Sequence, residues 1–167
     1  MMKNICMLLS LFCTAVAAQA AEPKALSRVS TLTTEAALIA ADAALKDCRK
    51  RGALVAVAVV DRSGVALAML RDALSGMHTP ETATRKAWTA VSFKSSTVDM
   101  EKVTAYNQPS SGIRQLPNVV MIGGGLPIQA AGSLVGGIGV SGAPGGEMDD
   151  ECAKAGVKAI RDALDLE

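Results

Sequence analysis

Glycine is concentrated in one part of this chain. Ten of the fifteen glycines in the 167-residue sequence lie between Gly123 and Gly146. Glycine has no Cβ atom, so this crowding indicates a backbone that turns sharply or is approached closely by a neighbour. Short apolar runs at 127–130 and 134–141 flank a turn-like Ala-Gly-Ser sequence. Together with residues 118–122 ahead of the triple glycine, they predict three antiparallel strands joined by tight turns.

The last of these segments alternates between large and small side chains. Successive side chains of a strand point to opposite faces of the sheet, so one face of residues 134–141 is bulky and the other nearly bare. The bulky face carries Leu134, Ile138 and Val140, and the bare face carries Gly137, Gly139 and Ser141. Residues 53–60 and 65–71 alternate similarly between alanine and larger apolar residues. We interpret them as strands of one sheet whose small-residue face admits a helix, another subunit or a flat ligand.

The first twenty residues have the pattern of a secretory signal peptide. Lys3 precedes an apolar run from Ile5 to Ala18, and Ala18-Gln19-Ala20 is the small-x-small pattern that a signal peptidase requires. We therefore expect cleavage after Ala20 and export to the periplasm or the exterior. The apolar run is shorter than a membrane span, and no later segment has the length and pattern of one.

The mature chain is expected to form a single domain. Removing twenty residues from 167 leaves 147, with a flexible arm over 21–31 and one domain over 32–167. Lys3 leaves with the signal, so sixteen of the seventeen Lys and Arg residues face sixteen acids. This balance gives no support for nucleic acid or an anionic membrane as a partner. Few aromatic residues remain for stacking on sugars or bases, namely Trp88, Phe93 and Tyr106.

The segment before the first strand is predicted to be an amphipathic helix. Residues 33–51 carry an apolar stripe at helical spacing, with Thr33 as N-cap and Gly52 just beyond the end. The first two strands are joined by residues 61–64, a turn in which Gly64 can take the positive φ that closes a hairpin.

Three further helices are expected. Thr79 suits the cap and Pro80 the first position of a helix over 79–93. A shorter helix is expected over 96–104. The last helix follows Gly146, and the acids of its first turn complement the helix dipole. These acids are Glu147, Asp149, Asp150 and Glu151.

Two cysteines remain after signal cleavage. Cys48 lies near the end of the first predicted helix and Cys152 near the start of the last. If these helices run antiparallel, the two ends meet, and an oxidising compartment permits a disulfide. Two buried free thiols are the alternative. The chain has no Cys-x-x-Cys pair, so metal and redox motifs receive no support from spacing.

Two blocks of the sequence resemble a known family. They read VAVVDRSGVALAMLRDALSGMHTPETATRKAWTA and GGGLPIQAAGSLVGGIGVSGAPGGEMDDECAKAG. Over residues 31 to 164 the chain is similar to the GlcG/HbpS family of haem-binding proteins. The resemblance implies an α+β domain with a five-stranded antiparallel sheet flanked by helices in a profilin-like layering. It also implies homo-oligomers up to octamers, and haem binding or slow haem degradation in some members. Other members accompany glycolate-utilisation or corrinoid enzymes.

His78 is the candidate ligand to haem iron. It is the sole histidine, and neutral imidazole is the commonest protein ligand to that metal. Near a helix start it could instead bond a backbone group. Met77 offers a thioether as an alternative ligand or one from a second chain, but two adjacent side chains cannot bind one iron from opposite sides. Its alternative role is to fill a core or an interface. No Cys-x-x-Cys-His occurs, which excludes covalent c-type attachment.

Four further residues are candidates for contacts with haem. Arg71, Arg85 and Lys86 could hold the propionates, because carboxylates favour guanidinium and ammonium groups. Each could equally be a solvated surface charge. Trp88 lies three residues after Arg85 on the same predicted helix, where it could lie against a porphyrin or in the core.

The residue patterns predict no catalytic site. The sequence has no G-x-S-x-G motif, and one histidine leaves little for acid–base chemistry. The family resemblance, together with His78 near Arg85 and Lys86, leads to the main hypothesis. It is an exported protein that binds haem non-covalently for sequestration, delivery or sensing, or that degrades haem slowly. One alternative is an enzyme or enzyme accessory for a small carboxylate such as glycolate, with the triple glycine and Arg71 as anion holders. Another is a structural homo-oligomer.

Overall fold

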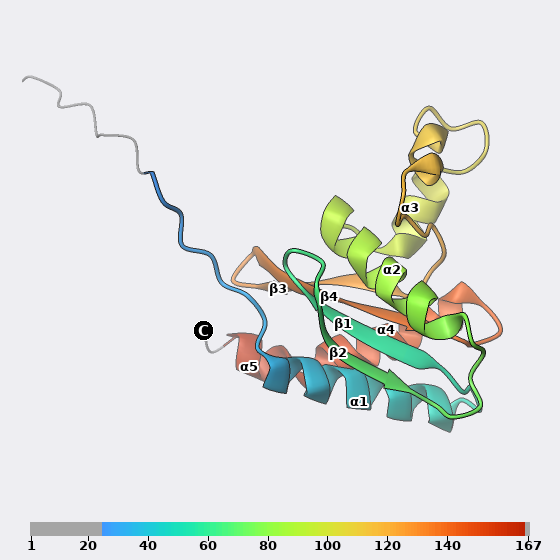
Figure 1. Cartoon of the computed structure of the whole chain (residues 1–167), viewed down its shortest axis with the longest axis horizontal. Helices are drawn as coiled ribbons and strands as arrows, with labels where there is room; N and C mark the ends of the chain where they lie inside the picture. The colour runs from blue at the N-terminus through green and yellow to red at the C-terminus, as the bar shows by residue number, and fades with distance from the viewer. Residues whose placement is uncertain (1–24, 166–167) are drawn as a thin grey trace, which may run out of the picture.

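The structure, a computed structural model, describes residues 25–165 (Figure 1). The expected signal peptide lies outside these residues. In chain order the elements are α1 (Thr34–Lys50), β1 (Ala56–Asp61), β2 (Ala66–Arg71), α2 (Thr79–Phe93), α3 (Thr97–Val103), the 3-10 helix η1 (Ser111–Gln115), β3 (Gly125–Ala130), β4 (Ser133–Ser141), α4 (Gly146–Ala159) and α5 (Arg161–Asp165). No helix in this part of the chain has the length and apolar character needed to cross a membrane.

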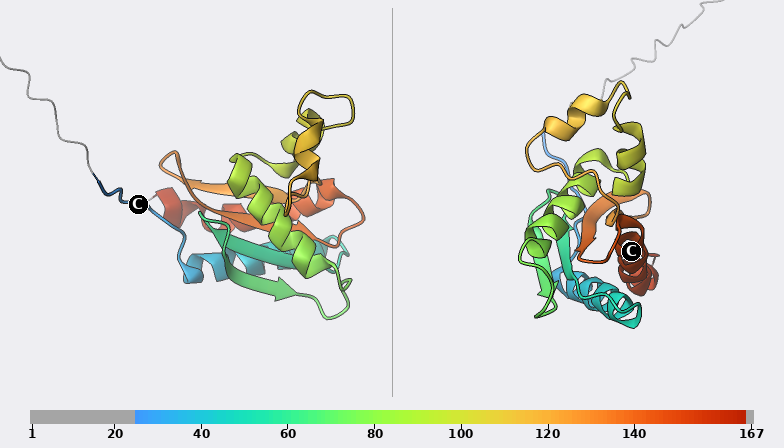
Figure 2. Two further views of the ribbon diagram at one scale, coloured as in Figure 1. Left: turned by 45° about the horizontal axis from the view of Figure 1, so that its top comes forward. Right: turned by 90° about the vertical axis from the view of Figure 1, so that its right-hand side faces the viewer.

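One antiparallel sheet separates the helices into two layers. Its strand order is β2-β1-β4-β3, and α1 and α4 cover one face while α2 crosses the other (Figure 2). The main core lies on the α1–α4 side, where the valines of β1 meet the alanines of α1. The α3–η1 segment, residues 96–122, projects away from these layers. The α+β class with helices on both faces of an antiparallel sheet is as predicted.

The sheet has four strands within residues 25–165, and the prediction of five was wrong in number. The missing strand is the one expected over 118–122. Val119 and Met121 instead pack in a small apolar cluster with Met100 of α3. The backbone N–H of Val120 donates to the hydroxyl of Thr89 at 3.0 Å, so this segment runs along α2 and pairs with no strand.

The bare face of β4 is covered by α2. A Cβ atom on Gly139 would collide with the carbonyl oxygen of Ala83 and lie 2.7 Å from the backbone nitrogen of Ala87. One on Gly137 would lie 2.6 Å from a methyl group of Val91. Of the three neighbours that the sequence allowed for this face, the structure shows a helix, packed against the strand backbone.

Replacing Gly139 with alanine should therefore destabilise the fold by about 2 kcal/mol or more, because overpacking forces α2 off the sheet. The matched control is Gly112→Ala, because a Cβ on Gly112 meets nothing within 4 Å and its φ is not positive. Urea unfolding of both variants measures the difference. Equal stability of the two variants would contradict the close α2–β4 packing.

The predicted N-cap of α1 is confirmed, whereas that of α2 is wrong by one residue. Thr33 caps α1, with its hydroxyl accepting from Ala36 N–H at 3.2 Å. In α2 the N-cap position is held by His78, and the expected cap Thr79 is the first helical residue. The Thr79 hydroxyl donates backward to Gly76 O at 2.8 Å, so it stabilises the preceding loop and caps no N–H.

A disulfide joins the two helices of the main layer. Cys48 near the end of α1 and Cys152 in α4 have an S–S distance of 2.06 Å and a Cα–Cα distance of 5.4 Å. Both residues are fully buried in the core. The structure thus resolves the two alternatives in favour of a bridge, which joins the last turn of α1 to the middle of α4.

Candidate functional site

The loop between β2 and α2, residues 72–78, is held by polar contacts at its base. The carboxylate of Asp72 accepts from Arg49 Nε at 2.7 Å and from the N–H of Val55 at 3.1 Å. The guanidinium of Arg71 donates to the carbonyl of Ser75 at 2.8 Å and of Ala73 at 3.2 Å. Arg71 thereby fixes the loop through Nη2, and its contact with a propionate stays a prediction.

The same loop exposes apolar side chains at its outer edge. Leu74 is 84% exposed and Met77 is 95% exposed. The exposed His78 follows them on the same loop. Met77 is therefore no core residue of the single chain, and its predicted alternatives as interface filler or second-chain ligand stay open.

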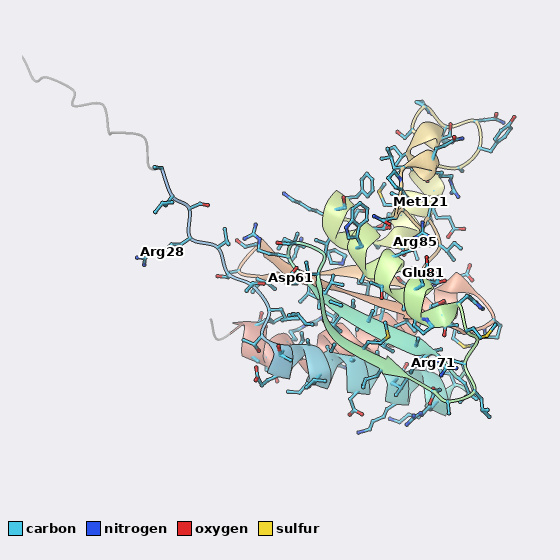
Figure 3. The ribbon with its side chains drawn as sticks, in the orientation of Figure 1. Arg28, Asp61, Arg71, Glu81, Arg85 and Met121 are labelled. Atoms are coloured by element: carbon cyan, nitrogen blue, oxygen red, sulfur yellow. A yellow bond between two sulfur atoms is a disulfide. The ribbon has the colours of Figure 1, made fainter. Side chains whose placement is uncertain are left out.

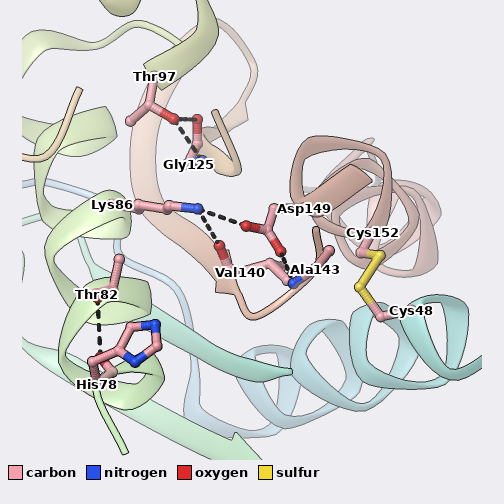
Figure 4. A network of polar contacts seen from close by, with 10 residues as sticks. All are labelled: Cys48, His78, Thr82, Lys86, Thr97, Gly125, Val140, Ala143, Asp149 and Cys152. Carbon is pink, nitrogen blue, oxygen red and sulfur yellow. Dashed lines mark hydrogen bonds and ion pairs between the residues drawn. A yellow bond between two sulfur atoms is a disulfide. The ribbon is translucent and has the colours of Figure 1, made fainter. Parts of the chain in front are cut away.

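His78 presents a free imidazole at the start of α2 (Figure 4). Its carbonyl accepts from the N–H of Thr82 at 3.0 Å and from the Thr82 hydroxyl at 3.0 Å. In residues 25–165 no hydrogen bond engages either ring nitrogen, and the side chain makes no capping bond. The imidazole is thus not used by the backbone in the single chain and is available to an external group.

Arg85 lies on the same face of α2 as His78. Seven residues span almost two turns, so the two side chains leave the helix about 10 Å apart on one side. Arg85 contacts Glu81 at 3.5 Å, while its Nε atom is buried without a partner. Figure 3 places Glu81 and Arg85 in succession along this face. An imidazole and a guanidinium at this separation match a flat metal complex with carboxylates at its rim.

Lys86 is located in the interior, in contrast to the predicted place at a pocket rim. The residue is 1% exposed, and its ammonium donates to Asp149 Oδ2 at 2.7 Å and to the carbonyl of Val140 at 2.9 Å. The other Asp149 oxygen accepts from Ala143 N–H at 3.1 Å. Burial raises the pKa of Asp149, and the charge of Lys86 opposes this effect. The pair joins α2, β4 and α4 in one contact (Figure 4).

Trp88 is located away from His78. A Cβ on Gly64, in the β1–β2 turn, would lie 2.6 Å from Trp88 Cδ1, so the indole covers this turn. Ten residues of helix separate Trp88 from His78, or about 15 Å along the axis. The structure therefore does not bring Trp88 together with His78.

The comparisons with known proteins agree on one family. The model described as haem degrading protein HbpS-like matches residues 32–158. The chain belongs to the HbpS-like family. A crystal structure of a double mutant of HbpS from Streptomyces reticuli is 40% identical, with a TM-score of 0.78 over 87% of this chain and 98% of that one. Klebsiella pneumoniae ORFY is 27% identical, with a TM-score of 0.80 over 83% and 97% of the two chains.

Two further HbpS-like matches come from PduO proteins. A structure described as a PduOC:heme complex is 29% identical, with a TM-score of 0.73 over 78% of this chain and 95% of that one. The corrinoid adenosyltransferase PduO of Salmonella typhimurium is 33% identical over 111 residues. Those residues are 64% of this chain and 32% of PduO, so this chain spans about a third of the curated relatives it matches.

The triple glycine of this HbpS-like chain serves packing. A Cβ on Gly123 would lie 2.8 Å from the carbonyl oxygen of Gly146, and one on Gly124 would lie 2.6 Å from Asp149 Cβ. The N–H of Gly125 donates to Thr97 Oγ1 at 2.8 Å. Arg71, the other anion holder expected for a small-carboxylate enzyme, bonds its own loop through Nη2 and is exposed at the surface. The described residues contain no group of three His, Cys, Asp or Glu side chains placed to hold a metal ion.

The Lys86–Asp149 pair was missed by the sequence analysis. Its signal was present, because Lys86 interrupts the apolar stripe of Ala83, Ala87 and Ala90 on the buried side of α2. A lysine within such a stripe requires a buried acid partner. Which acid supplies it depends on how α4 is placed, and local patterns do not contain that information.

Proposed function

We propose that this protein binds haem non-covalently, with His78 as an axial ligand and Arg85 at a propionate. The observation that carries the proposal is the unbonded imidazole at the start of α2, two turns from a guanidinium with a buried unpartnered Nε. Membership of the HbpS-like family and similarity to a PduOC:heme complex support the choice of ligand. Haem supplies iron for ligation or redox chemistry, and the chain supplies the imidazole and the charge that orient it.

Export and self-association complete the proposal. The Cys48–Cys152 bridge suits an oxidising compartment, which supports export after cleavage near Ala20. Leu74 and Met77 beside His78 leave the ligand on an open apolar surface, so we place the bound haem between this loop and a second copy of the chain. Sequestration, delivery, sensing and slow haem degradation each suit such a site.

Titration with hemin tests the haem proposal. Wild type should show a saturable Soret change, and His78→Ala should weaken binding by more than about tenfold, because even outer-shell partners of metal ligands contribute that much. Arg85→Gln should weaken binding less. Ile39→Ala is the matched control, since it shortens an exposed apolar side chain on α1, across the sheet from His78 and α2.

The same samples test whether the bound haem lies between two copies of the chain. Light scattering during the titration should give a mass above that of one chain for the haem-bound species. Absence of a Soret change at stoichiometric hemin, or equal affinity of wild type and His78→Ala, would reject His78 ligation.

A further inference from the structure

Two adjoining depressions lie at the opposite end of α2 from His78. The larger measures about 490 Å³ and the smaller about 280 Å³, and both are lined by Arg62, Lys94 and Leu134. Lys94 follows His78 by sixteen residues, which corresponds to about 24 Å along a helix. These depressions are therefore separate from the haem site proposed above.

The lining of both depressions is cationic without a compensating acid. Arg62 and Lys94 contribute positive charge, and no Asp or Glu lines either depression. Within residues 25–165 neither cation takes part in an ion pair, whereas Arg49, Lys86 and Lys154 each do. Arg28 also lines the larger depression, but its side chain points away from the domain in Figure 3 and is left out of the charge balance.

The turn that carries Arg62 is fixed by the preceding residue. Asp61 accepts from the N–H of Ser63 at 2.7 Å and of Val65 at 3.0 Å through the same carboxylate oxygen. Its charge is thus directed into the turn, and Asp61 does not line either depression. Arg62 is half-buried on this turn, so its guanidinium has a restricted range.

Lys94 has an unusual backbone for its residue type. It ends α2 with a φ of 52° in the left-handed region, where glycine or asparagine is the usual choice. Its N–H donates to the carbonyls of Ala90 and Val91, so the carbonyl end of α2 is capped. A left-handed residue is a common way for an α-helix to end, so this backbone fixes where the Lys94 side chain leaves the helix.

Uncharged surfaces adjoin the two cations. The larger depression adds polar groups of Ser30, Gln129 and Ser133. The smaller one adds the indole of Trp88 and the side chain of Val91. A ligand with acid groups on one part and an apolar part on the other meets complementary surfaces here.

We propose that these depressions form a second ligand site, for a small organic anion whose carboxylate or phosphate groups bind Arg62 and Lys94. The apolar part of the ligand rests against Trp88. The chemistry shared by carboxylate and phosphate defines the site, and the two sources are separated by experiment.

Trp88 is the only tryptophan of the chain, so its fluorescence reports on this site directly. Full-length mature protein is titrated with phenylacetate and, separately, with phenyl phosphate, each at constant ionic strength set with sodium chloride. At least one of the two should change the emission saturably, and the tighter of them identifies the preferred acid group. Raising the salt concentration should weaken binding, because both contacts are electrostatic.

Substitutions of the two cations test whether the probe binds at these depressions. Arg62→Gln and Lys94→Asn should each weaken the bound probe by about tenfold, the factor expected for one charge-assisted hydrogen bond. Asparagine tolerates the left-handed backbone of position 94, so folding is retained. Lys50→Gln, which removes an exposed cation on α1, should bind as wild type does.

Two results would overturn the proposal. One is no saturable change with either probe up to millimolar concentration. The other is unchanged affinity in the Arg62→Gln/Lys94→Asn double variant with an intact melting transition. Should the double variant fail to fold, calorimetric competition between probe and sodium chloride on wild type decides, because a specific site retains the probe at matched ionic strength.

Discussion

Replacing Asp149 with alanine should lower the free energy of unfolding by about 3–5 kcal/mol, the cost of leaving one member of a buried ion pair without its partner. The remaining ammonium of Lys86 would be left with only the carbonyl of Val140 at 2.9 Å. Lys86 lies between α2, β4 and α4, so no nearby solvent can replace the lost carboxylate. Chemical denaturation measures the change. Lys46→Met, which removes an exposed ion pair with Asp42 on α1, should cost less than about 1 kcal/mol.

Replacing the other member of the pair, Lys86, should make the stability of the protein depend on pH. In Lys86→Met the buried carboxyl of Asp149 remains without the cation, and its pKa, already raised by burial, rises further. The folded state then binds a proton more readily than the unfolded state. Stability should therefore increase as the pH falls from the raised pKa of the folded state toward the ordinary value of 3.8. A stability of this variant that is flat with pH over that range would contradict an unpaired buried Asp149.

A double variant isolates the interaction between the two charges. Lys86→Met combined with Asp149→Ala removes both charges, so the loss of stability should be smaller than the sum of the two single losses. If the losses simply add, the two groups do not interact, and the 2.7 Å contact contributes no net stability.

The order and type of most elements could be predicted because their signals are local. The alternation in β1, the Thr33 cap and the Gly64 turn each depend on a few neighbouring residues, and each occurs in the structure. In β4 the predicted face is confirmed for Ile138 and Val140, but Leu134 packs on the α2 side because the register shifts beside it.

The strand predicted over 118–122 is absent from the sheet because contacts with distant residues decide its place. Their apolar side chains suit a strand, but Val120 N–H bonds to Thr89 of α2 and the flanking side chains pack toward α3.

The roles of the candidate site residues depend even more on contacts that local sequence does not reveal. His78 and Arg85 could be placed on one helix face from their spacing alone. Lys86 and Trp88 are neighbours of Arg85 in sequence, yet one is buried against Asp149 and the other covers the Gly64 turn. Which side of α2 faces the sheet decides these roles, and the glycines of β4 determine that side.

Removing the Cys48–Cys152 bridge should lower the free energy of unfolding by about 4 kcal/mol, which makes it the other large effect expected of this fold. The two residues are separated by 104 positions, so the bridge closes a long loop and strongly restricts the unfolded chain. A Cys48→Ala/Cys152→Ala variant should melt on the order of 10 °C below wild type.

The native bridge should also resist reduction. Both sulfur atoms are buried between α1 and α4, so a thiol reagent reaches them only when the helices separate. Mass spectrometry after thiol treatment should find an intact bridge in the folded protein and a reduced one above the melting transition. The double alanine variant with or without reductant controls for reagent effects. A loss of stability under about 1 kcal/mol in that variant would show that packing of α1 against α4 suffices without the bridge, and that chain restriction contributes little.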